Sequence, residues 1–178
     1  MCAGCPHRGL FYTLNKNKCT VLGDIGCYTL GAVAPLSAMD MTLCMGGSIS
    51  AIHGFNKARG GESEHKTVAV IGDSTFTHSG MTGLLDCVNE NADVTIVISD
   101  NETTAMTGGQ DSAGTGRLEA ICAGIGVAPE HIRVVVPLKK NYEEMKQIIR
   151  EEIEHHGVSV IIPRRECIQT LARKKRNK

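Results

Sequence analysis

The chain has 178 residues, which is the size of a single domain able to bury a core of its own. Hydrophobic residues make up 42% and charged residues 21%, so the composition is that of a globular protein. A formal net charge of zero, with three Phe, three Tyr and no Trp, argues against a nucleic-acid-binding protein. No apolar run approaches the roughly 20 residues of a membrane span, and the first residues lack the shape of a signal peptide, so we expect a cytoplasmic protein.

Short apolar runs alternate with helical patterns along the chain. Strands are predicted at 20–23, 41–44, 67–71, 94–99, 132–136 and 159–162, and helices at 6–15, 48–59, 80–89, 118–123 and 142–155. The runs 67–71 and 94–98 are almost continuously apolar or β-branched, which is typical of strands buried on both faces of a parallel sheet. The pattern predicts an α/β fold: a doubly wound, mostly parallel sheet of about six strands with helices on both faces.

The last predicted helix and the segment after it set the boundary of the domain. In the helix at 142–155 the apolar positions fall on one face, Asn141 can serve as its N-cap and Gly157 can close it. We therefore expect one domain over residues 1–170 and a basic tail over 171–178, with the basic residues from Arg173 on forming a frayed end or a linker. The long segment 100–116 is rich in Thr, Gly and Ser, and such loops are often functional.

Polar side chains follow two consecutive strands of the predicted sheet. Asp73 comes directly after the first of these strands, and Asn101 follows the next, 28 positions later. Ligands of doubly wound sheets bind at the carboxyl ends of the strands, so the two side chains should meet there. Carboxylate and amide oxygens suit Mg²⁺, which typically shares its coordination sphere with phosphate oxygens. The small residues Gly72 and Ser74 would let a diphosphate approach the backbone.

This arrangement resembles the thiamine-diphosphate motif, which runs from Gly-Asp-Gly to a later Asn; Ser74 stands here where many members have Gly. The resemblance implies that Asp73, Asn101 and the carbonyl of Thr103 bind Mg²⁺. The Thr-Gly-Gly-Gln sequence at 107–110 is similar to an element of pyruvate:ferredoxin oxidoreductase and its relatives. The cofactor-binding residues implied by the resemblance are Ile25, Gly26, Cys27, Gly47, Ser48, Ile49, Gly72, Asp73, Ser74, Thr75, Asn101, Thr103, Thr104, Ala105 and Met106.

The chain begins with Cys2-Ala3-Gly4-Cys5-Pro6-His7-Arg8, which resembles the amino-terminal cysteine element of the 2-oxoacid:ferredoxin oxidoreductases, and most of all that of the indolepyruvate enzymes. By this resemblance Cys2, Cys5, Cys27 and Cys167 are the four ligands of a [4Fe–4S] cluster, which carries single electrons. A zinc site, a redox dithiol and buried thiols remain alternatives. Cys19, Cys44, Cys87 and Cys122 are expected to be small core residues.

Two further residues, His7 and Ile49, are assigned roles only by resemblance, and for Asp24 two alternatives stay open. His7 is expected to face the cofactor or the substrate carboxylate, as a catalytic residue. Ile49 follows Met45-Gly46-Gly47-Ser48 and could be the apolar side chain that holds the cofactor bent. Asp24 could either cap a helix or line the same pocket.

The resemblance implies an enzyme that oxidatively decarboxylates aryl 2-oxoacids such as indolepyruvate, with thiamine diphosphate and Mg²⁺ as cofactors, coenzyme A as co-substrate and ferredoxin as electron acceptor. Enzymes of this type take an activating glutamate from a separate pyrimidine-binding domain or subunit, for which 178 residues leave no room, so we expect partner chains or an oligomer. Two alternatives stay open. One is half of a non-oxidative decarboxylase of the sulfopyruvate or phosphonopyruvate type, and the other is a binding or zinc-stabilised module without turnover.

Overall fold

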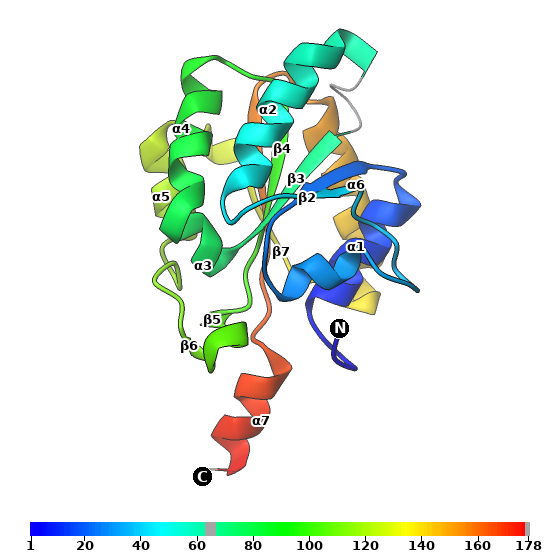
Figure 1. The fold of residues 1–178 in the computed structure, drawn as a ribbon, viewed down its shortest axis with the longest axis vertical. Coiled ribbons are helices and arrows are strands. Elements are labelled where there is room, and N and C mark those ends of the chain that lie inside the picture. Colours follow the sequence, from blue (N-terminus) through cyan, green and yellow to red (C-terminus); the bar gives the residue numbers. More distant parts are fainter. Residues whose placement is uncertain (63–66, 177–178) are drawn as a thin grey trace.

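The computed structural model describes residues 1–62 and 67–176, and it has the predicted α/β architecture (Figure 1). Six strands form one parallel sheet in the order β2-β1-β3-β4-β8-β7. Their bounds are β1 Thr20–Gly23, β2 Met41–Thr42, β3 Thr67–Gly72, β4 Val94–Ser99, β7 Ile132–Val135 and β8 Val158–Pro163. All six predicted strands exist, but the one predicted at 41–44 has only two residues.

Helices cover both faces of the sheet (Figure 1). On one face lie α1 (His7–Lys16) and α6 (Tyr142–Glu154), and on the other lie α2 (Gly47–Arg59), α4 (Met81–Asn89) and α5 (Leu118–Ile125). Short helical turns connect these elements: η1 Cys27–Gly31, η2 Gly60–Glu62, η4 Ala105–Thr107, η5 Pro129–His131 and η6 Lys139–Asn141. No helix among the residues that the structure describes is long and apolar enough to cross a membrane.

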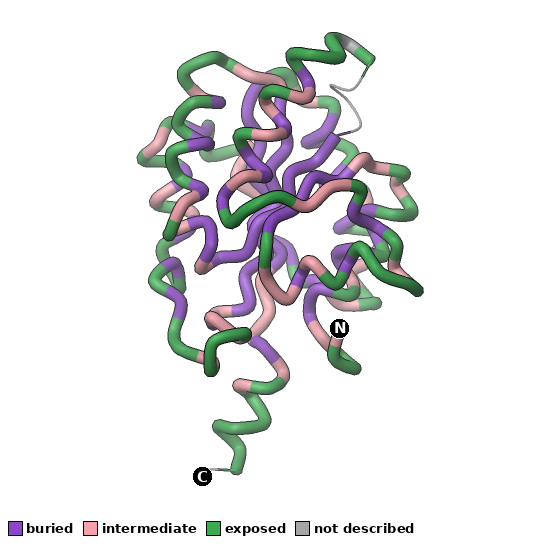
Figure 2. The backbone as a smooth tube through the Cα atoms, viewed as in Figure 1, coloured by how far each residue is buried: buried purple, intermediate pink, exposed green. Residues whose placement is uncertain are grey.

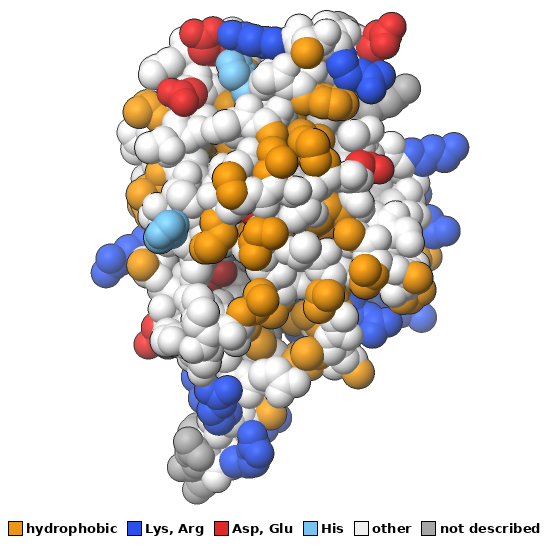
Figure 3. All heavy atoms as spheres, viewed as in Figure 1, with side chains coloured by type: hydrophobic (Ala, Val, Ile, Leu, Met, Phe, Trp, Pro, Cys, Tyr) orange, Lys and Arg blue, Asp and Glu red, His pale blue; other side chains and the backbone are white. Residues whose placement is uncertain are grey.

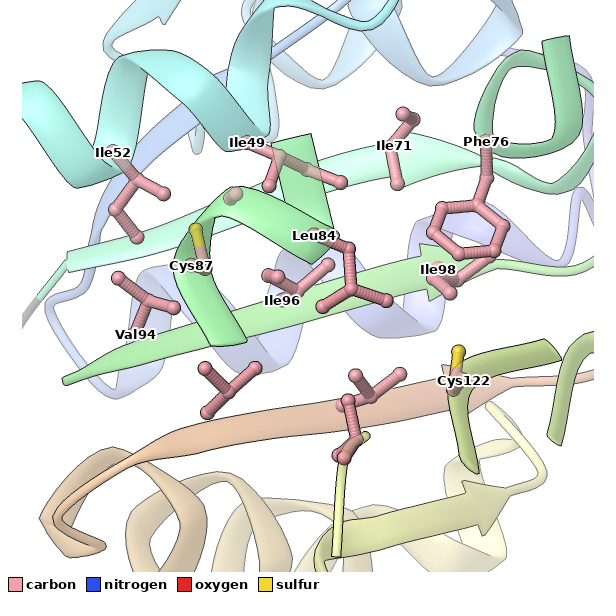
Figure 4. Close-up of a cluster of buried hydrophobic side chains, with 14 of the residues drawn as sticks. Ile49, Ile52, Ile71, Phe76, Leu84, Cys87, Val94, Ile96, Ile98 and Cys122 are labelled. Atoms are coloured by element: carbon pink, nitrogen blue, oxygen red, sulfur yellow. The ribbon is translucent and has the colours of Figure 1, made fainter. Parts of the chain in front are cut away.

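The core consists of two layers, one on each face of the sheet, because the central strands are buried on both sides. Every residue of β3, β4 and β8 is buried, as Figure 2 shows by colour. In the first layer, side chains of α2, α4 and α5 point towards those of β3 and β4, among them Ile49, Leu84 and Ile96 (Figure 4). In the second layer, Leu10 and Phe11 of α1 pack with apolar residues of α6.

Three segments differ from the sequence prediction. Helical backbone begins at Asp73, well before position 80: α3 (Asp73–Thr75) runs through one π-helical turn (Phe76–Gly80) into α4. The loop 100–116 contains a small hairpin, β5 (Thr103–Thr104) and β6 (Gln110–Asp111). The expected frayed tail is instead α7 (Ile168–Arg176), which projects from the domain (Figure 1) and exposes residues 171–176 on all sides; positions 177–178 lie outside the described residues.

The ends of α6 also depart from the predicted chemistry. Asn141 does not cap the helix with its side chain, since its Nδ2 donates instead to the carbonyl oxygen of Val136 at 3.1 Å. The helix ends at Glu154, and Gly157 follows with a φ of 124°, a conformation that favours glycine.

Candidate functional site

A cavity of about 210 Å³ lies at the carboxyl ends of β1, β3 and β4. The chain leaves β1 for β2 on one side and returns to β3 on the other, so this is the switch point of the sheet, where ligands of doubly wound folds bind. The residues lining the cavity are His7, Ile25, Gly26, Cys27, Tyr28, Met45, Gly72, Asp73, Ser74, Thr75, Ser99, Asn101, Thr103, Thr104, Ala105, Met106 and Thr107.

Asp73 and Asn101 both line this cavity, because they follow neighbouring parallel strands in matching register. Gly72, the last residue of β3, pairs with Ser99, the last residue of β4. The Asp73 side chain is buried, its Oδ2 has no hydrogen-bond partner among the described residues, and burial raises the pKa of its carboxyl to about 6. A buried carboxylate oxygen without a partner is costly unless a cation or another donor reaches it, so the site fits a bound Mg²⁺.

The hairpin β5–β6 forms another wall of the cavity. Oδ1 of Asn101 accepts a hydrogen bond from the Thr103 backbone N–H at 3.2 Å, which fixes the start of the hairpin. The hydroxyl groups of Ser74 and Thr104 lie 2.6 Å apart, so the turn after β3 is joined to β5. Exposed Met106 stands at the rim of the cavity.

His7 lies at the start of α1, with its ring buried against the end of β4. Its Nδ1 forms a short hydrogen bond with the Ser99 hydroxyl, and its Nε2 lies 3.1 Å from Nδ2 of Asn101. Burial lowers the pKa of the imidazole to about 4, so His7 is neutral at pH 7. Each ring nitrogen thus contacts a protein side chain, Nδ1 that of Ser99 and Nε2 that of Asn101.

Three residues expected at the cofactor, Gly47, Ser48 and Ile49, do not line the cavity. Ile49 is fully buried in the core between α2 and the sheet (Figure 4). The nearby carboxylate of Asp24 accepts hydrogen bonds from the backbone N–H groups of Gly46 (3.1 Å) and Ser48 (2.7 Å), so it caps α2. Gly46 has a φ of 85°, and a Cβ there would lie 2.5 Å from the Ser79 hydroxyl oxygen. The sequence pattern 46–49 thus has a structural explanation in this chain.

Tyr28, Met45, Ser99 and Thr107 line the cavity although they were not among the expected cofactor-binding residues. Ser99 directly precedes Asp100-Asn101 and Tyr28 directly follows Cys27, so proximity to the motifs was their one signal. The glycine at 72 makes room for a protein side chain, since a Cβ there would lie 2.7 Å from Cε1 of Tyr28. His78 is exposed and lies outside the cavity.

A second cavity, of about 180 Å³, brings together the four cysteines of the amino-terminal and carboxyl-terminal motifs. Cys2, Cys5, Cys27 and Cys167 all line it. Burial raises the pKa of the Cys5 and Cys27 thiols, and neighbouring cysteines of the set raise both further. No three His, Cys, Asp or Glu side chains of the described residues converge on a single metal ion. The four thiols therefore share one cavity.

Of the other cysteines, Cys87 and Cys122 are core residues as predicted. Cys44 is exposed and Cys19 is half-buried, so the prediction of four core thiols was wrong for Cys44.

The segment after β8 carries Cys167 into this second cavity. Arg164 bonds through Nε to Oδ2 of buried Asp100 at 2.6 Å, and both of its terminal nitrogens bond to the Glu119 carboxylate at 2.8 and 2.7 Å. This ion pair holds the segment alongside residues 100–101. His7, Cys27, Asn101 and Ala105 line both cavities and so form their common wall.

The fold and the two cavities define a doubly wound α/β ligand-binding domain, with its principal site at the switch point and a thiol-lined site beside it. Residues 24–162 match the family model described as thiamine pyrophosphate enzyme, C-terminal TPP binding domain. The chain belongs to this family.

Known proteins similar to the chain fall into two groups. The first is made up of indolepyruvate oxidoreductase subunits IorA: the one from Archaeoglobus fulgidus is 38% identical over 99% of this chain and 30% of its own length, and the one from Pyrococcus horikoshii is 38% identical over 94% and 29%. The chain thus spans about 30% of the length of these relatives.

The second group consists of solved structures that share the fold. The 2-oxoglutarate:ferredoxin oxidoreductase from Magnetococcus marinus has a TM-score of 0.71 at 18% identity, covering 94% of this chain and 64% of that one. The benzoylformate decarboxylase from Polynucleobacter necessarius has a TM-score of 0.62 at 19% identity, covering 88% and 32%.

Proposed function

We propose that this chain is the thiamine-diphosphate- and Mg²⁺-binding part of an oxidoreductase that decarboxylates aryl 2-oxoacids such as indolepyruvate to acyl-CoA, with ferredoxin as electron acceptor. One observation carries the proposal: Asp73 and Asn101 follow paired strands onto the wall of one cavity, and the buried Oδ2 of Asp73 has no partner among the described residues. The similarity to IorA subunits supports the class of substrate.

In this proposal Asp73, the side chain of Asn101 and the carbonyl of Thr103 hold Mg²⁺. Residues 25–27, 72–75 and 103–106 form the cofactor wall, since all of them line the cavity. Bound thiamine diphosphate would supply the carbanion chemistry that 2-oxoacid decarboxylation requires. The chain itself binds the diphosphate end, and the apolar side chains of Ile25, Met45 and Met106 are exposed at the rim of the cavity.

The four cysteines Cys2, Cys5, Cys27 and Cys167 are proposed to hold a [4Fe–4S] cluster. Their cavity shares a wall with the cofactor cavity, so electrons leaving the cofactor site have a short path to the cluster. A reducing cytoplasm would keep these thiols available as ligands, and we place the enzyme there.

Partner chains or domains are proposed to complete the enzyme, namely a pyrimidine-binding part and a ferredoxin or ferredoxin-like part. Hydrophobic side chains gather on the face seen in Figure 3, while Lys and Arg lie mainly at its edges and on the projecting end of the molecule. Large exposed apolar residues follow β1 and β2 and occur on α4: Leu30, Val33, Leu43, Met45, Met81 and Leu85. Exposed apolar patches of this kind are typical of protein–protein interfaces rather than of the solvent-exposed surface of a monomer.

The test is calorimetry of the chain with thiamine diphosphate in the presence and absence of Mg²⁺. We expect saturable binding that requires Mg²⁺ and is lost in Asp73→Ala. Binding that is absent from the wild type, or unchanged in the variant, contradicts the proposal and favours a module of another kind.

A non-oxidative decarboxylase half is the second candidate function, because the benzoylformate decarboxylase shares the fold. It needs the metal site but no cluster. Iron and acid-labile sulfide in anaerobically purified protein, with absorbance near 400 nm, distinguish the two: a colourless, iron-free protein that still binds thiamine diphosphate favours the decarboxylase.

A further inference from the structure

His7 stands on the wall common to both cavities, yet its ring is directed at protein groups. Nδ1 bonds to the hydroxyl of Ser99, and Nε2 lies 3.1 Å from Nδ2 of Asn101. The ring is almost completely buried. A group that exchanges protons with a substrate needs a nitrogen within reach of it, and neither nitrogen here is unengaged.

The hydrogen bonds around Asn101 fix one arrangement of donors and acceptors. The Thr103 backbone N–H can only donate, so the atom 3.2 Å from it is the amide oxygen Oδ1. Nδ2 therefore faces His7 and donates to Nε2. Nε2 must then be unprotonated, so Nδ1 carries the proton and donates to Ser99. Rotating the amide by half a turn would set two donors, the Thr103 N–H and the Asn101 NH₂ group, against each other.

This matters because Mg²⁺ coordinates oxygen and not an amide nitrogen. Oδ1 has two lone pairs, of which Thr103 takes one and leaves the other for a metal ion. We propose that His7 is a positioning residue that fixes the Asn101 amide with its oxygen directed at the magnesium ion, rather than a residue that reacts with substrate. This inference rests on the proposed function, since it concerns the same metal site.

His7 also joins this site to the cysteine pair. It follows Cys5, which lines the thiol-lined cavity, by two positions, while its side chain contacts Asn101. The Cys-Pro-His sequence thus places His7 next to the thiol-lined cavity and its side chain at the proposed metal site.

The test compares His7→Phe with His7→Gln in the 178-residue chain. Gln can still accept a hydrogen bond from Nδ2 of Asn101 through its Oε1, whereas Phe cannot. The readout is the apparent affinity for Mg²⁺, titrated by calorimetry at saturating thiamine diphosphate. We expect His7→Phe to weaken it by about tenfold, as loss of an outer-shell partner of a metal ligand does, and His7→Gln to restore most of it.

Asn101→Asp supplies the matched background, because a carboxylate presents oxygen whichever way it turns. In that background His7→Phe should change the Mg²⁺ affinity by less than about twofold, since no amide remains to be oriented. An equal loss in both backgrounds would show a general structural role and overturn the inference. If His7→Phe does not fold, Ser99→Ala removes the partner of Nδ1 and should weaken Mg²⁺ binding in the same direction.

The nitrogen chemical shifts of the His7 ring provide a readout that needs no cofactor. Long-range ¹⁵N–¹H spectra should show Nδ1 protonated and Nε2 unprotonated at pH 7. The opposite tautomer overturns the inference whatever the titrations show. A wild-type chain that binds no thiamine diphosphate overturns the proposed function and the metal role together, whereas equal Mg²⁺ affinities for wild type and His7→Phe overturn only the role of His7.

Discussion

The backbone N–H of Cys167 donates a hydrogen bond of 3.1 Å to the carbonyl oxygen of Asn101. Two residues earlier, the N–H of Arg165 donates to the carbonyl oxygen of Asp100 at 3.0 Å. The segment that carries the last cysteine is therefore bound to the segment that carries the proposed magnesium ligand. Asn101 lines both cavities and Cys167 lines the second, and the ion pair between Arg164 and buried Asp100 joins the same two segments.

Replacing Arg164 tests how much this contact contributes. In Arg164→Leu the carboxylate of Asp100, which is fully buried, loses its cation, and breaking a buried pair from one side costs about 3–5 kcal/mol. We expect the free energy of unfolding, measured with urea, to fall by that amount. Arg165→Leu is the control, because the Arg165 side chain reaches the carbonyl oxygen of Gly4 only at 3.5 Å, and its backbone bond to Asp100 is kept in the variant. Similar losses in both variants would contradict the role assigned to the pair.

Glu119, the second carboxylate that Arg164 contacts, predicts how the stability of the protein depends on pH. Hydrogen bonding from Arg164 holds the pKa of Glu119 below its ordinary value. The folded pKa is depressed, so the stabilisation is present above the unfolded pKa, about 4.3, and is lost as the pH falls through the folded value. Wild type should therefore exceed Glu119→Gln in stability at pH 7, and the difference should shrink towards pH 3. A gap for Glu119→Gln that is constant with pH would count against this assignment.

Much of the fold could be predicted because the determining signals are local. β3 and β4 are unbroken apolar or β-branched runs, and no other element explains them. The tail was misjudged as frayed because residues 171–176 are exposed and bury no apolar face, so packing against the core does not require α7. The hairpin β5–β6 has only two residues in each strand, too few for an alternation to be read.

The residues of the site could be predicted where they directly follow the end of a strand. Asp73 and Asn101 follow paired strands and so reach the same cavity. Ile49 was assigned to the cofactor from its sequence neighbours, yet the rotation of α2 turns its side chain into the core. Helix rotation depends on packing against the whole sheet, which a short motif does not contain. Ser99 was missed for a similar reason, since its contact with His7 joins residues 92 positions apart.

The isosteric change Asp73→Asn should separate function from stability. At pH 7.5 the wild-type carboxylate is buried, its Oδ2 lacks a partner among the described residues and its pKa is raised to about 6, so its ionised form destabilises the metal-free protein. We expect Asp73→Asn to equal or exceed the wild type in melting temperature without Mg²⁺ while losing Mg²⁺-dependent binding of thiamine diphosphate. Asp86→Asn, an exposed change on α4, should alter neither property. A variant that is both unstable and binding-competent would run against this expectation.

Iron analysis tests the four-cysteine cavity. Replacing Cys27 by Ser should remove most of the iron and acid-labile sulfide from anaerobically prepared protein, because Cys27 lines the thiol-lined cavity with the other three cysteines. Cys44→Ser is the matched control, since Cys44 is exposed and lies outside that cavity. Equal iron in the two variants, or zinc in place of iron in the wild type, would count against a cluster.

Substitutions of Ile49 test whether this side chain is a core residue or a contact of the cofactor. Its side chain is fully buried with Ile52, Ile71 and Leu84 (Figure 4), so Ile49→Ala should cost about 2–5 kcal/mol of unfolding free energy and Ile49→Val about 0.5–1.5. Ile49 does not line the cavity proposed for the cofactor. The affinity of the folded protein for thiamine diphosphate should therefore stay within about twofold of the wild type in Ile49→Val, because distant sites act independently. Calorimetry on the folded fraction, quantified by circular dichroism, measures both effects. A tenfold loss of affinity in Ile49→Val with little loss of stability would instead place this side chain against the cofactor.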